Sequence, residues 1–175
     1  MSKRVKQVIA ALAARITKQD RAFVAQYLIP VEAGLFWQMN LPDQRHALNV
    51  AYTARDLAAR AVNVNQELLI RCALLHDVGK VKGDVSTADK IITVILDKIA
   101  PAWVRRWGRS GRGGKVANLR HAVYIYYHHA ARGAAMLQAA GVAEEITAIV
   151  ARHHETPADG EPPELRLLRE ADNLN

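Results

Sequence analysis

The sequence predicts an all-α fold, a compact bundle of about eight or nine helices. Apolar residues recur at intervals of three and four along most of the chain, which is the spacing of one helix face. Capping residues and prolines divide these runs, and no stretch alternates apolar and polar residues as a half-buried strand would. A chain of 175 residues, 50% hydrophobic and 23% charged, fits one ordinary globular domain.

The amino-terminal part is predicted to be a helical extension of the domain. Its first helix is indicated by apolar residues at helical spacing, namely Val5, Val8, Ile9, Leu12 and Ile16. Thr17 and Asp20 have the spacing of a capping box and predict the start of a second helix. A third is expected from residue 30 to about 39, because proline is accepted in the first turn of a helix. We therefore divide the single domain into an extension, 1–40, and a core, 41–175.

Caps and prolines also predict the helices of the core. Pro42 opens a helix through the stretch "QRHALNVAYTARDLAARA". Asn65 can cap "QELLIRCALLHDV", and Ser86 can cap "TADKIITVILDKIA", which the following proline ends. Beyond a stretch rich in Gly and Arg, helices are expected at about 116–128, 130–140, 143–153 and 164–174. Gly141 is the expected stop of the second of these four.

Composition constrains the compartment and the partners. Cys72 is the single cysteine and lies in an apolar stretch, so we expect a buried thiol in a reducing compartment. Charged residues interrupt the apolar run near the amino terminus, and no 18-residue apolar stretch follows, which favours a cytoplasmic location. A formal charge of +7 and a pI near 9.8 favour anionic partners, whether phosphorylated small molecules, nucleic acid or acidic lipid.

The first chemistry-bearing stretch is "LLHDVGKVKGD". His76 and Asp77 end an apolar helix, and Gly79 can break that helix. Adjacent residues on a helix point about 100° apart, so both side chains can serve one metal only near the helix end. A carboxylate there can bridge two cations, while an imidazole from a neighbouring helix completes the shell. An isolated His-Asp pair is about equally consistent with a purely structural role.

Further motifs follow the pair in a fixed order. Upstream lies a His in "RHALNV"; downstream come a His four residues before a Gly in "HAARGAAML", a His-His-Glu before an acidic loop in "HHETPADG", and an Ala-Asp in "EADNLN". This order resembles the HD-domain superfamily of metal-dependent phosphohydrolases, and within it the HDIG and HD-GYP type, from His46 to Asp172. The loop "TPADGEPPE" lacks the Gly-Tyr-Pro of the cyclic-dinucleotide branch, Ala130 stands where proline is common, and Pro42 replaces an optional carboxylate ligand.

The resemblance implies a dinuclear metal site. One cation would be held by His46, His76, Asp77 and Asp172. Asp77 would bridge to a second cation, held by His129, His153 and His154. Five imidazoles with two carboxylates suit Fe, Mn or Zn better than Mg²⁺, so the expected cofactor is a divalent transition metal, two per chain. The resemblance further implies Asp77 and Lys80 as catalytic residues, with Lys80 and Arg132 as the candidates for binding the substrate.

Several histidines also have a structural interpretation. His121 shares a helix face with Tyr124 and is expected to be structural. Helical geometry lets only one of His128 and His129 aim inward, and the spacing to Gly133 favours His129. His154 is either a ligand or a residue that merely ends its helix.

The stretch "PAWVRRWGRSGRGGKVANLR" has a second functional interpretation. Trp103 and Trp107 lie one turn apart among basic residues, which are Arg105, Arg106, Arg109, Arg112, Lys115 and Arg120. Indoles with guanidiniums can seat on anionic lipid headgroups, or stack on a nucleobase and bind its phosphates. Residues 103–120 are therefore candidate contacts for an anionic membrane or nucleic acid. A core-facing Trp pair under a solvated loop is the structural alternative, and the glycines could also let this loop close as a lid.

The leading hypothesis is a metal-dependent phosphohydrolase, a phosphodiesterase or phosphomonoesterase, acting on a nucleotide or related phosphorylated small molecule. An alternative is a catalytically silent ligand-binding or membrane-surface regulator that keeps the metal site for structure. A third is an oxygen-activating di-iron enzyme, because some HD-domain relatives use two irons in that way.

Overall fold

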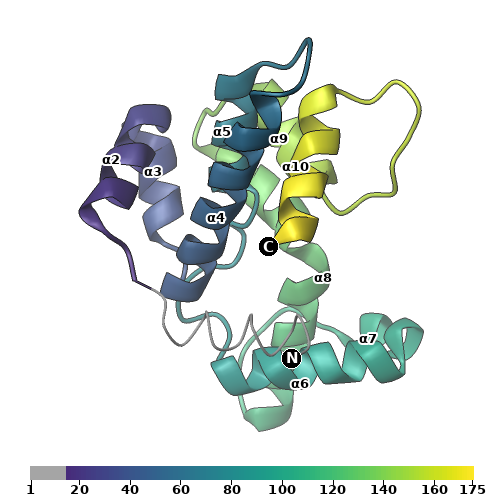
Figure 1. Ribbon diagram of the computed structural model, residues 1–175. Helices are drawn as coiled ribbons and strands as arrows, with labels where there is room; N and C mark the ends of the chain where they lie inside the picture. The colour runs from purple at the N-terminus through teal and green to yellow at the C-terminus, as the bar shows by residue number, and fades with distance from the viewer. Residues whose placement is uncertain (1–14) are drawn as a thin grey trace, which may run out of the picture.

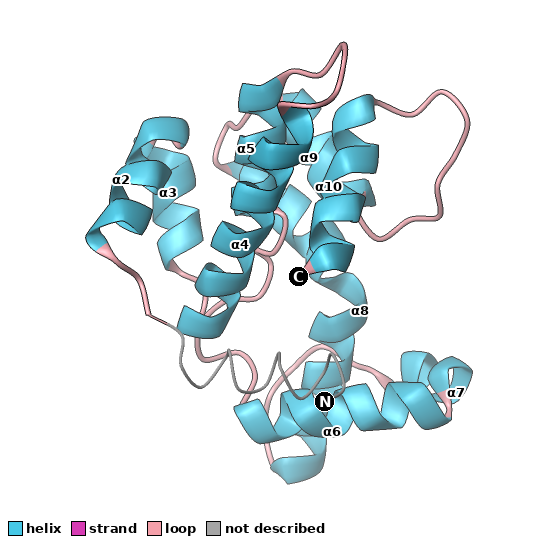
Figure 2. Cartoon of the chain, viewed as in Figure 1, coloured by secondary structure: helices cyan, strands magenta, loops and turns pink. Residues whose placement is uncertain are grey.

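The computed structural model describes residues 15–175, which form an all-α bundle as the sequence predicts (Figures 1 and 2). The described helices are α2 (Lys18–Tyr27), α3 (Pro30–Trp37), α4 (Leu41–Ala58), α5 (Gln66–Leu75), α6 (Thr87–Ile99), α7 (Pro101–Trp107), α8 (Lys115–Ala139), α9 (Glu144–Arg152) and α10 (Pro163–Leu174). The helix expected from Val5 onward lies outside the described residues, apart from Ile16, which precedes α2. None of the described helices combines the length and apolar character needed to cross a membrane.

The three predicted caps are present. Thr17 and Asp20 form a capping box, in which Asp20 N donates to Thr17 Oγ1 at 3.1 Å and Thr17 N donates to Asp20 Oδ2 at 2.8 Å. Asn65 Oδ1 accepts from the backbone of Leu68 at 3.1 Å, and Ser86 Oγ accepts from Asp89 N, also at 3.1 Å. Each bond pairs one of the backbone donors that a helix start leaves without a partner.

One predicted boundary was wrong, and one helix was not predicted. The expected helices at 116–128 and 130–140 are one continuous helix, α8, which passes through His129 without a break. Gly133 lies inside this helix and packs closely against Gly79. The sequence reading also missed α7, which Pro101 opens directly after α6 ends. The same proline that ends one helix occupies the first turn of the next, where its missing N–H costs nothing.

The main core lies between α2–α5, the carboxyl half of α8, α9 and α10. Its largest fully buried side chains include Phe36, Leu48, Leu69, Leu137 and Leu168. Within the described chain, no buried side chain of α6 or α7 belongs to this core. Figure 1 shows these two helices below the rest of the bundle, against the amino-terminal half of α8. The long α8 therefore joins the main core to a smaller helical layer.

Asp20, in α2, is a buried carboxylate with several hydrogen-bond partners. It is 4% exposed, and its oxygens accept from Arg45 Nη1 and Tyr52 Oη at 2.8 Å each, in addition to Thr17. Burial raises the pKa of Asp20, but hydrogen bonds from Thr17, Arg45 and Tyr52 outweigh it and lower the pKa from 3.8 to about 2. The charged form is therefore the one that stabilises the fold.

We expect Asp20→Asn to lower the free energy of unfolding by roughly 2 kcal/mol at neutral pH, as a shift of nearly two pKa units implies. Because the folded pKa is depressed, this contribution is full above the unfolded pKa of 3.8 and is lost as the pH falls towards about 2. Urea unfolding across this pH range measures it. Asp56→Asn, at an exposed ion pair with Arg55, is the matched control and should change little. If the loss of unfolding free energy caused by Asp20→Asn did not shrink on acidification, the stabilising role of the charged Asp20 would be contradicted.

Candidate metal site

All seven predicted metal ligands come together at one place in the bundle. His46 comes from α4, His129 from α8 and Asp172 from α10, while two pairs follow helix ends: His76 and Asp77 after α5, His153 and His154 after α9. Their ligand atoms form three overlapping groups, each with atoms within 4.8 Å of one another. The groups are His46, His76 and Asp172; His129, His153 and His154; and His76, Asp77 and His153.

The first group brings together residues that lie far apart in the chain. His46 Nε2 lies 2.9 Å from Asp172 Oδ1, and His76 Nε2 lies 3.8 Å from the same oxygen. The rings of His46 and His76 meet edge to face with their centroids 5.4 Å apart. Three possible ligand atoms thus face a common point.

The second group consists of imidazoles only. The Nε2 atoms of His129 and His154 lie 2.9 Å apart, which is close enough for two lone pairs to share one proton or one cation. The ring of His153 lies 5.5 Å from that of His129 and 4.0 Å from that of His154, measured between centroids. His154 therefore turns inward, although the residue as a whole is exposed.

Asp77 lies between the two groups. Its Oδ2 is 3.5 Å from His76 Nε2, and its Oδ1 is 3.2 Å from His129 Nε2. Each carboxylate oxygen therefore faces an imidazole of a different group, which is the arrangement that a bridging carboxylate needs. The Nζ atom of Lys80 lies 2.8 Å from this carboxylate.

The buried imidazoles are held in one tautomer by their own helices. His76 Nδ1 donates to Ala73 O at 2.8 Å, and His153 Nδ1 donates to Val150 O at 2.7 Å, three residues back in each case. His129 Nδ1 donates in the same way to Tyr126 O at 2.9 Å. A histidine that donates from Nδ1 presents a lone pair at Nε2, the usual state of a metal ligand.

Two of these Nε2 atoms, those of His76 and His153, are buried and make no hydrogen bond within the described chain. A buried polar atom left unpaired costs about 1–3 kcal/mol, so such atoms call for an explanation. Ligation of a cation by both atoms supplies one. The donor set and these two unpaired nitrogens fit a transition metal of the Fe, Mn or Zn type.

Electrostatics favours the protonation states that a metal requires. Burial lowers the pKa of His76, and it lowers the pKa of His153 well below the usual value; burial and the neighbouring His129 lower the pKa of His154 to about 4. These imidazoles are thus neutral near pH 7. Burial raises the pKa of Asp77, but the positive charge of Lys80 and the nearby imidazoles outweigh it, so this carboxyl titrates well below its usual range.

His46 and Asp172 stabilise each other's charged forms. Burial lowers the pKa of His46, yet its hydrogen bond to Asp172 and the charge of Asp77 raise it overall. Burial likewise raises the pKa of Asp172, and the bond from His46 outweighs this and lowers it.

A close backbone contact fixes Asp77 against α8. A Cβ atom on Gly79 would lie 2.1 Å from the carbonyl oxygen of His129 and 2.9 Å from Gly133 N. A Cβ atom on Gly133 would in turn lie 3.1 Å from Gly79 N. Only two residues without side chains allow this approach, which sets the distance between the turn after α5 and the helix that carries His129.

The two candidate substrate-binding residues lie in different environments. The side chain of Lys80 is 25% exposed at the edge of the site. Arg132 donates to Gly79 O at 3.0 Å and forms an ion pair with Asp84, so its guanidinium ties the loop after the His-Asp pair to α8. A role for either residue in substrate binding stays a prediction.

The remaining histidines lie apart from the ligand groups. His121 Nδ1 accepts from Gly111 N at 3.3 Å, and its pKa is lowered by burial. His128 is exposed, with its ring 4.6 Å from that of Tyr124. Glu155 is exposed and pairs with Arg152 at 3.0 Å.

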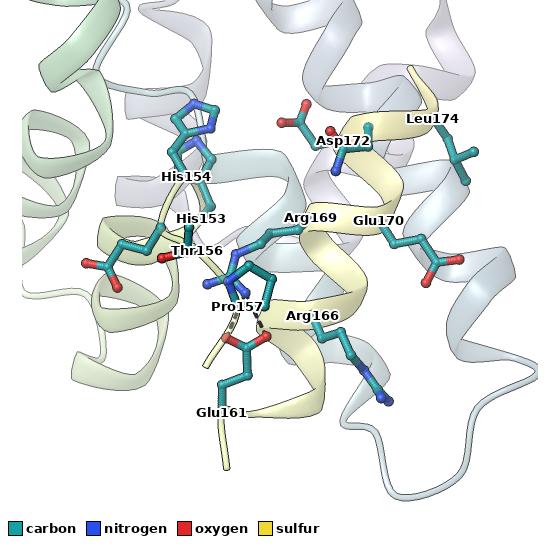
Figure 3. A pocket seen from close by; sticks show the side chains of 12 residues that line it. His153, His154, Thr156, Pro157, Glu161, Arg166, Arg169, Glu170, Asp172 and Leu174 are labelled. Carbon is teal, nitrogen blue, oxygen red and sulfur yellow. Dashed lines mark hydrogen bonds and ion pairs between the residues drawn. The ribbon is translucent and has the colours of Figure 1, made fainter. Parts of the chain in front are cut away.

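A pocket of about 580 Å³ opens beside the ligand groups, with His153 and His154 on one side and Asp172 on the other (Figure 3). Glu155 also lines it, and the sequence analysis did not point to the rest of its polar lining, which is Thr156, Glu161, Arg166, Arg169, Glu170 and Asn173. Nη1 of Arg169 donates to both carboxylate oxygens of Glu161, at 2.6 and 2.7 Å, which fixes the loop before α10. The signal was present, because residues 166, 169 and 172 follow one another at intervals of three along a helix.

An all-α bundle that gathers five imidazoles and two carboxylates beside a pocket defines a candidate metal-binding domain. The family model described as HD domain matches residues 44–175, and the chain therefore belongs to the HD-domain family. Searches of the curated proteins and of the solved structures found no significant match.

We expect Gly79→Ala to lower the free energy of unfolding by about 3 kcal/mol or more, because a methyl group would overlap the backbone of α8. Metal bound per chain, measured by elemental analysis, should fall with it as Asp77 and His129 separate. Gly34→Ala is the matched control: Gly34 is exposed within α3 and has open space around it, so alanine should add roughly 0.5–1 kcal/mol. Unchanged stability and metal content in Gly79→Ala would refute the close contact.

Proposed function

We propose that this protein is a metal-dependent phosphohydrolase that cleaves a phosphoester of a nucleotide or related phosphorylated small molecule at a dinuclear site. The observation that carries the proposal is the position of Asp77, whose two oxygens face imidazoles of two separate ligand groups. Membership of the HD-domain family supports the reaction class. The HDIG-like or HD-GYP-like subtype is part of the proposal.

The ligands divide between two cations in this proposal. His46, His76 and Asp172 would hold one, and His129, His153 and His154 the other, with Asp77 shared. Fe, Mn or Zn fits this nitrogen-rich donor set better than Mg²⁺. When bound, a pair of such cations supplies Lewis acidity for a phosphoryl oxygen and lowers the pKa of water towards neutrality.

Lys80 provides a positive charge next to the ligands, where its ammonium pairs with Asp77. Burial lowers its pKa, but Asp77 and Asp43 outweigh this and raise it, so the ammonium is charged at neutral pH. A lysine is a compact point charge on a flexible stem, suited to a phosphate oxygen or to a leaving oxygen that gains charge. We assign Lys80 this role in binding and in stabilising the leaving group.

The pocket matches a small substrate. Its volume lies within the roughly 300–1,000 Å³ typical of small-molecule sites. Arg166 lies on its edge, exposed and without an ion pair among the described residues, so it can meet a second anionic group of a substrate. Arg169 is ion-paired with Glu161, and both residues form part of the pocket wall.

We expect His76→Ala and Asp77→Ala, each loaded with Mn²⁺ or Fe²⁺, to abolish hydrolysis of an aryl phosphodiester or of the responsive member of a nucleotide panel. Each change removes a ligand, so metal content should also fall. His128→Ala is the matched control, since it removes an exposed imidazole one residue from His129. Wild-type turnover in both site variants would rule out this site, and oxygen consumption without hydrolysis would favour the di-iron alternative.

Lys80→Ala tests the charge separately from the metal. We expect kcat/KM to fall by on the order of 10²–10³, the usual effect of losing one electrostatic stabiliser. Metal content should not fall, because Lys80 is not a ligand and its ammonium competes with a cation for the oxygens of Asp77. Lys80→Arg should restore part of the activity. Full activity in Lys80→Ala would remove this residue from the mechanism.

A further inference from the structure

The helical layer formed by α6 and α7 exposes an apolar stripe that the metal site does not use. Along α6 the stripe consists of isoleucines at helical spacing, namely Ile91, Ile92, Ile95 and Ile99, all exposed. Ile99 is 74% exposed, and Trp103, in α7, is 57% exposed. Large apolar side chains in such a row are unusual on a protein surface that meets only water. We call these five residues the apolar stripe.

Positive charge is concentrated in the segment that carries the apolar stripe. Residues 87–120 contain eight Lys and Arg against two Asp, so this fifth of the chain carries +6 of the total formal charge of +7. Within the described chain, no ion pair involves the basic residues Lys98, Arg106, Arg109, Arg112 and Lys115. All five are exposed. The charges are therefore available to an anionic partner.

The layer is firmly attached despite lying outside the main core. Lys90 Nζ lies 2.6 Å from Asp43 Oδ2 of α4. Tyr126 Oη donates to Asp97 at 3.0 Å, and Tyr127 bonds the same carboxylate, which joins α6 to α8. The buried Thr93 and Val104 face the rest of the layer. The apolar stripe is thus the outer face of a fixed element.

The side chains favour lipid over nucleic acid as the partner. Single-stranded nucleic acid is bound by aromatic rings that stack on bases. Here the rings of Trp103 and Trp107 stack on each other, 5.6 Å apart and 14° from parallel, and Arg120 covers Trp107. Isoleucines offer no stacking surface, but they do enter the boundary between headgroups and acyl chains, with Trp and Lys or Arg at its edge.

We propose that α6, α7 and the basic loop 108–115 form a docking surface for an anionic lipid bilayer, in which the apolar stripe enters the headgroup boundary. Charge complementarity argues against two other occupants. The chain's own residues 1–14 carry Lys3, Arg4 and Lys6, and a second copy would bring the same positive charge to the contact. The proposal does not depend on hydrolysis at the metal site.

Flotation with vesicles tests the proposal on the full chain. We expect the protein to float with vesicles of phosphatidylcholine mixed with phosphatidylglycerol, and on the order of tenfold less with phosphatidylcholine alone or at high salt. Trp emission should shift to shorter wavelength as Trp103 leaves water. Equal binding to neutral and anionic vesicles, or none to either, would overturn the proposal.

Two double variants separate the apolar contribution to vesicle binding from the electrostatic one. Ile95→Asp with Ile99→Asp should reduce flotation about tenfold by removing apolar contact, and Arg109→Glu with Arg112→Glu should do the same by reversing charge. The matched control is Arg60→Glu with Val62→Asp, at an exposed basic residue and an exposed valine after α4. Circular dichroism and metal content should be unchanged in all three. Normal flotation of either stripe or loop variant would contradict the proposal.

Two alternatives, vesicle binding through the amino-terminal segment and binding of nucleic acid, are tested by separate measurements. Val8→Asp with Leu12→Asp should leave flotation intact, and a loss there with no loss in Ile95→Asp with Ile99→Asp would assign binding to the amino-terminal segment. Fluorescence anisotropy with a labelled single-stranded oligonucleotide forms the other arm. Protein that binds the oligonucleotide but not anionic vesicles would replace lipid with nucleic acid as the partner.

Discussion

The site depends on one repeated hydrogen bond, in which a buried imidazole donates from Nδ1 to a carbonyl three residues back in its own helix. His76, His129 and His153 all make it, at 2.7–2.9 Å. The bond fixes both the tautomer and the direction of each ring, so three Nε2 lone pairs converge with no side chain needed to orient these three rings from behind. For His76 and His153 it also pairs a carbonyl near a helix end, where helices leave such groups without a partner.

The convergence has an energetic cost in the metal-free protein. Unpaired buried nitrogens and a fully buried carboxylate oppose folding, because desolvation penalises each of them. Lys80 offsets part of this cost by supplying Asp77 with a counter-charge. A cation that enters the site competes with that ammonium for the same oxygens. Folding, metal affinity and the position of Lys80 are therefore coupled, and a bound metal stabilises the fold by its own binding free energy.

The architecture separates two kinds of surface along one helix. The carboxyl half of α8 carries His129 and Gly133 and packs in the main core, while its amino-terminal half supports α6 and α7. The candidate metal site gathers its ligand groups on the core side of the bundle, and the outer layer exposes isoleucine and arginine. Because α8 is continuous and not broken at residue 129, the two surfaces have a fixed orientation with respect to each other.

The sequence by itself determined the helical class and the caps at Thr17, Asn65 and Ser86, because these depend on local spacing. It also favoured His129 over His128 as the inward residue, and His129 is buried whereas His128 is exposed. It predicted a break between residues 128 and 130 where α8 is continuous, since spacing along the chain does not show that Gly133, inside this helix, packs against Gly79. Tertiary structure alone decided that residues 46 and 172, far apart in the chain, share one hydrogen bond. It also decided that the isoleucines of α6 face outward, because periodicity shows that a helix has an apolar face but not what covers it.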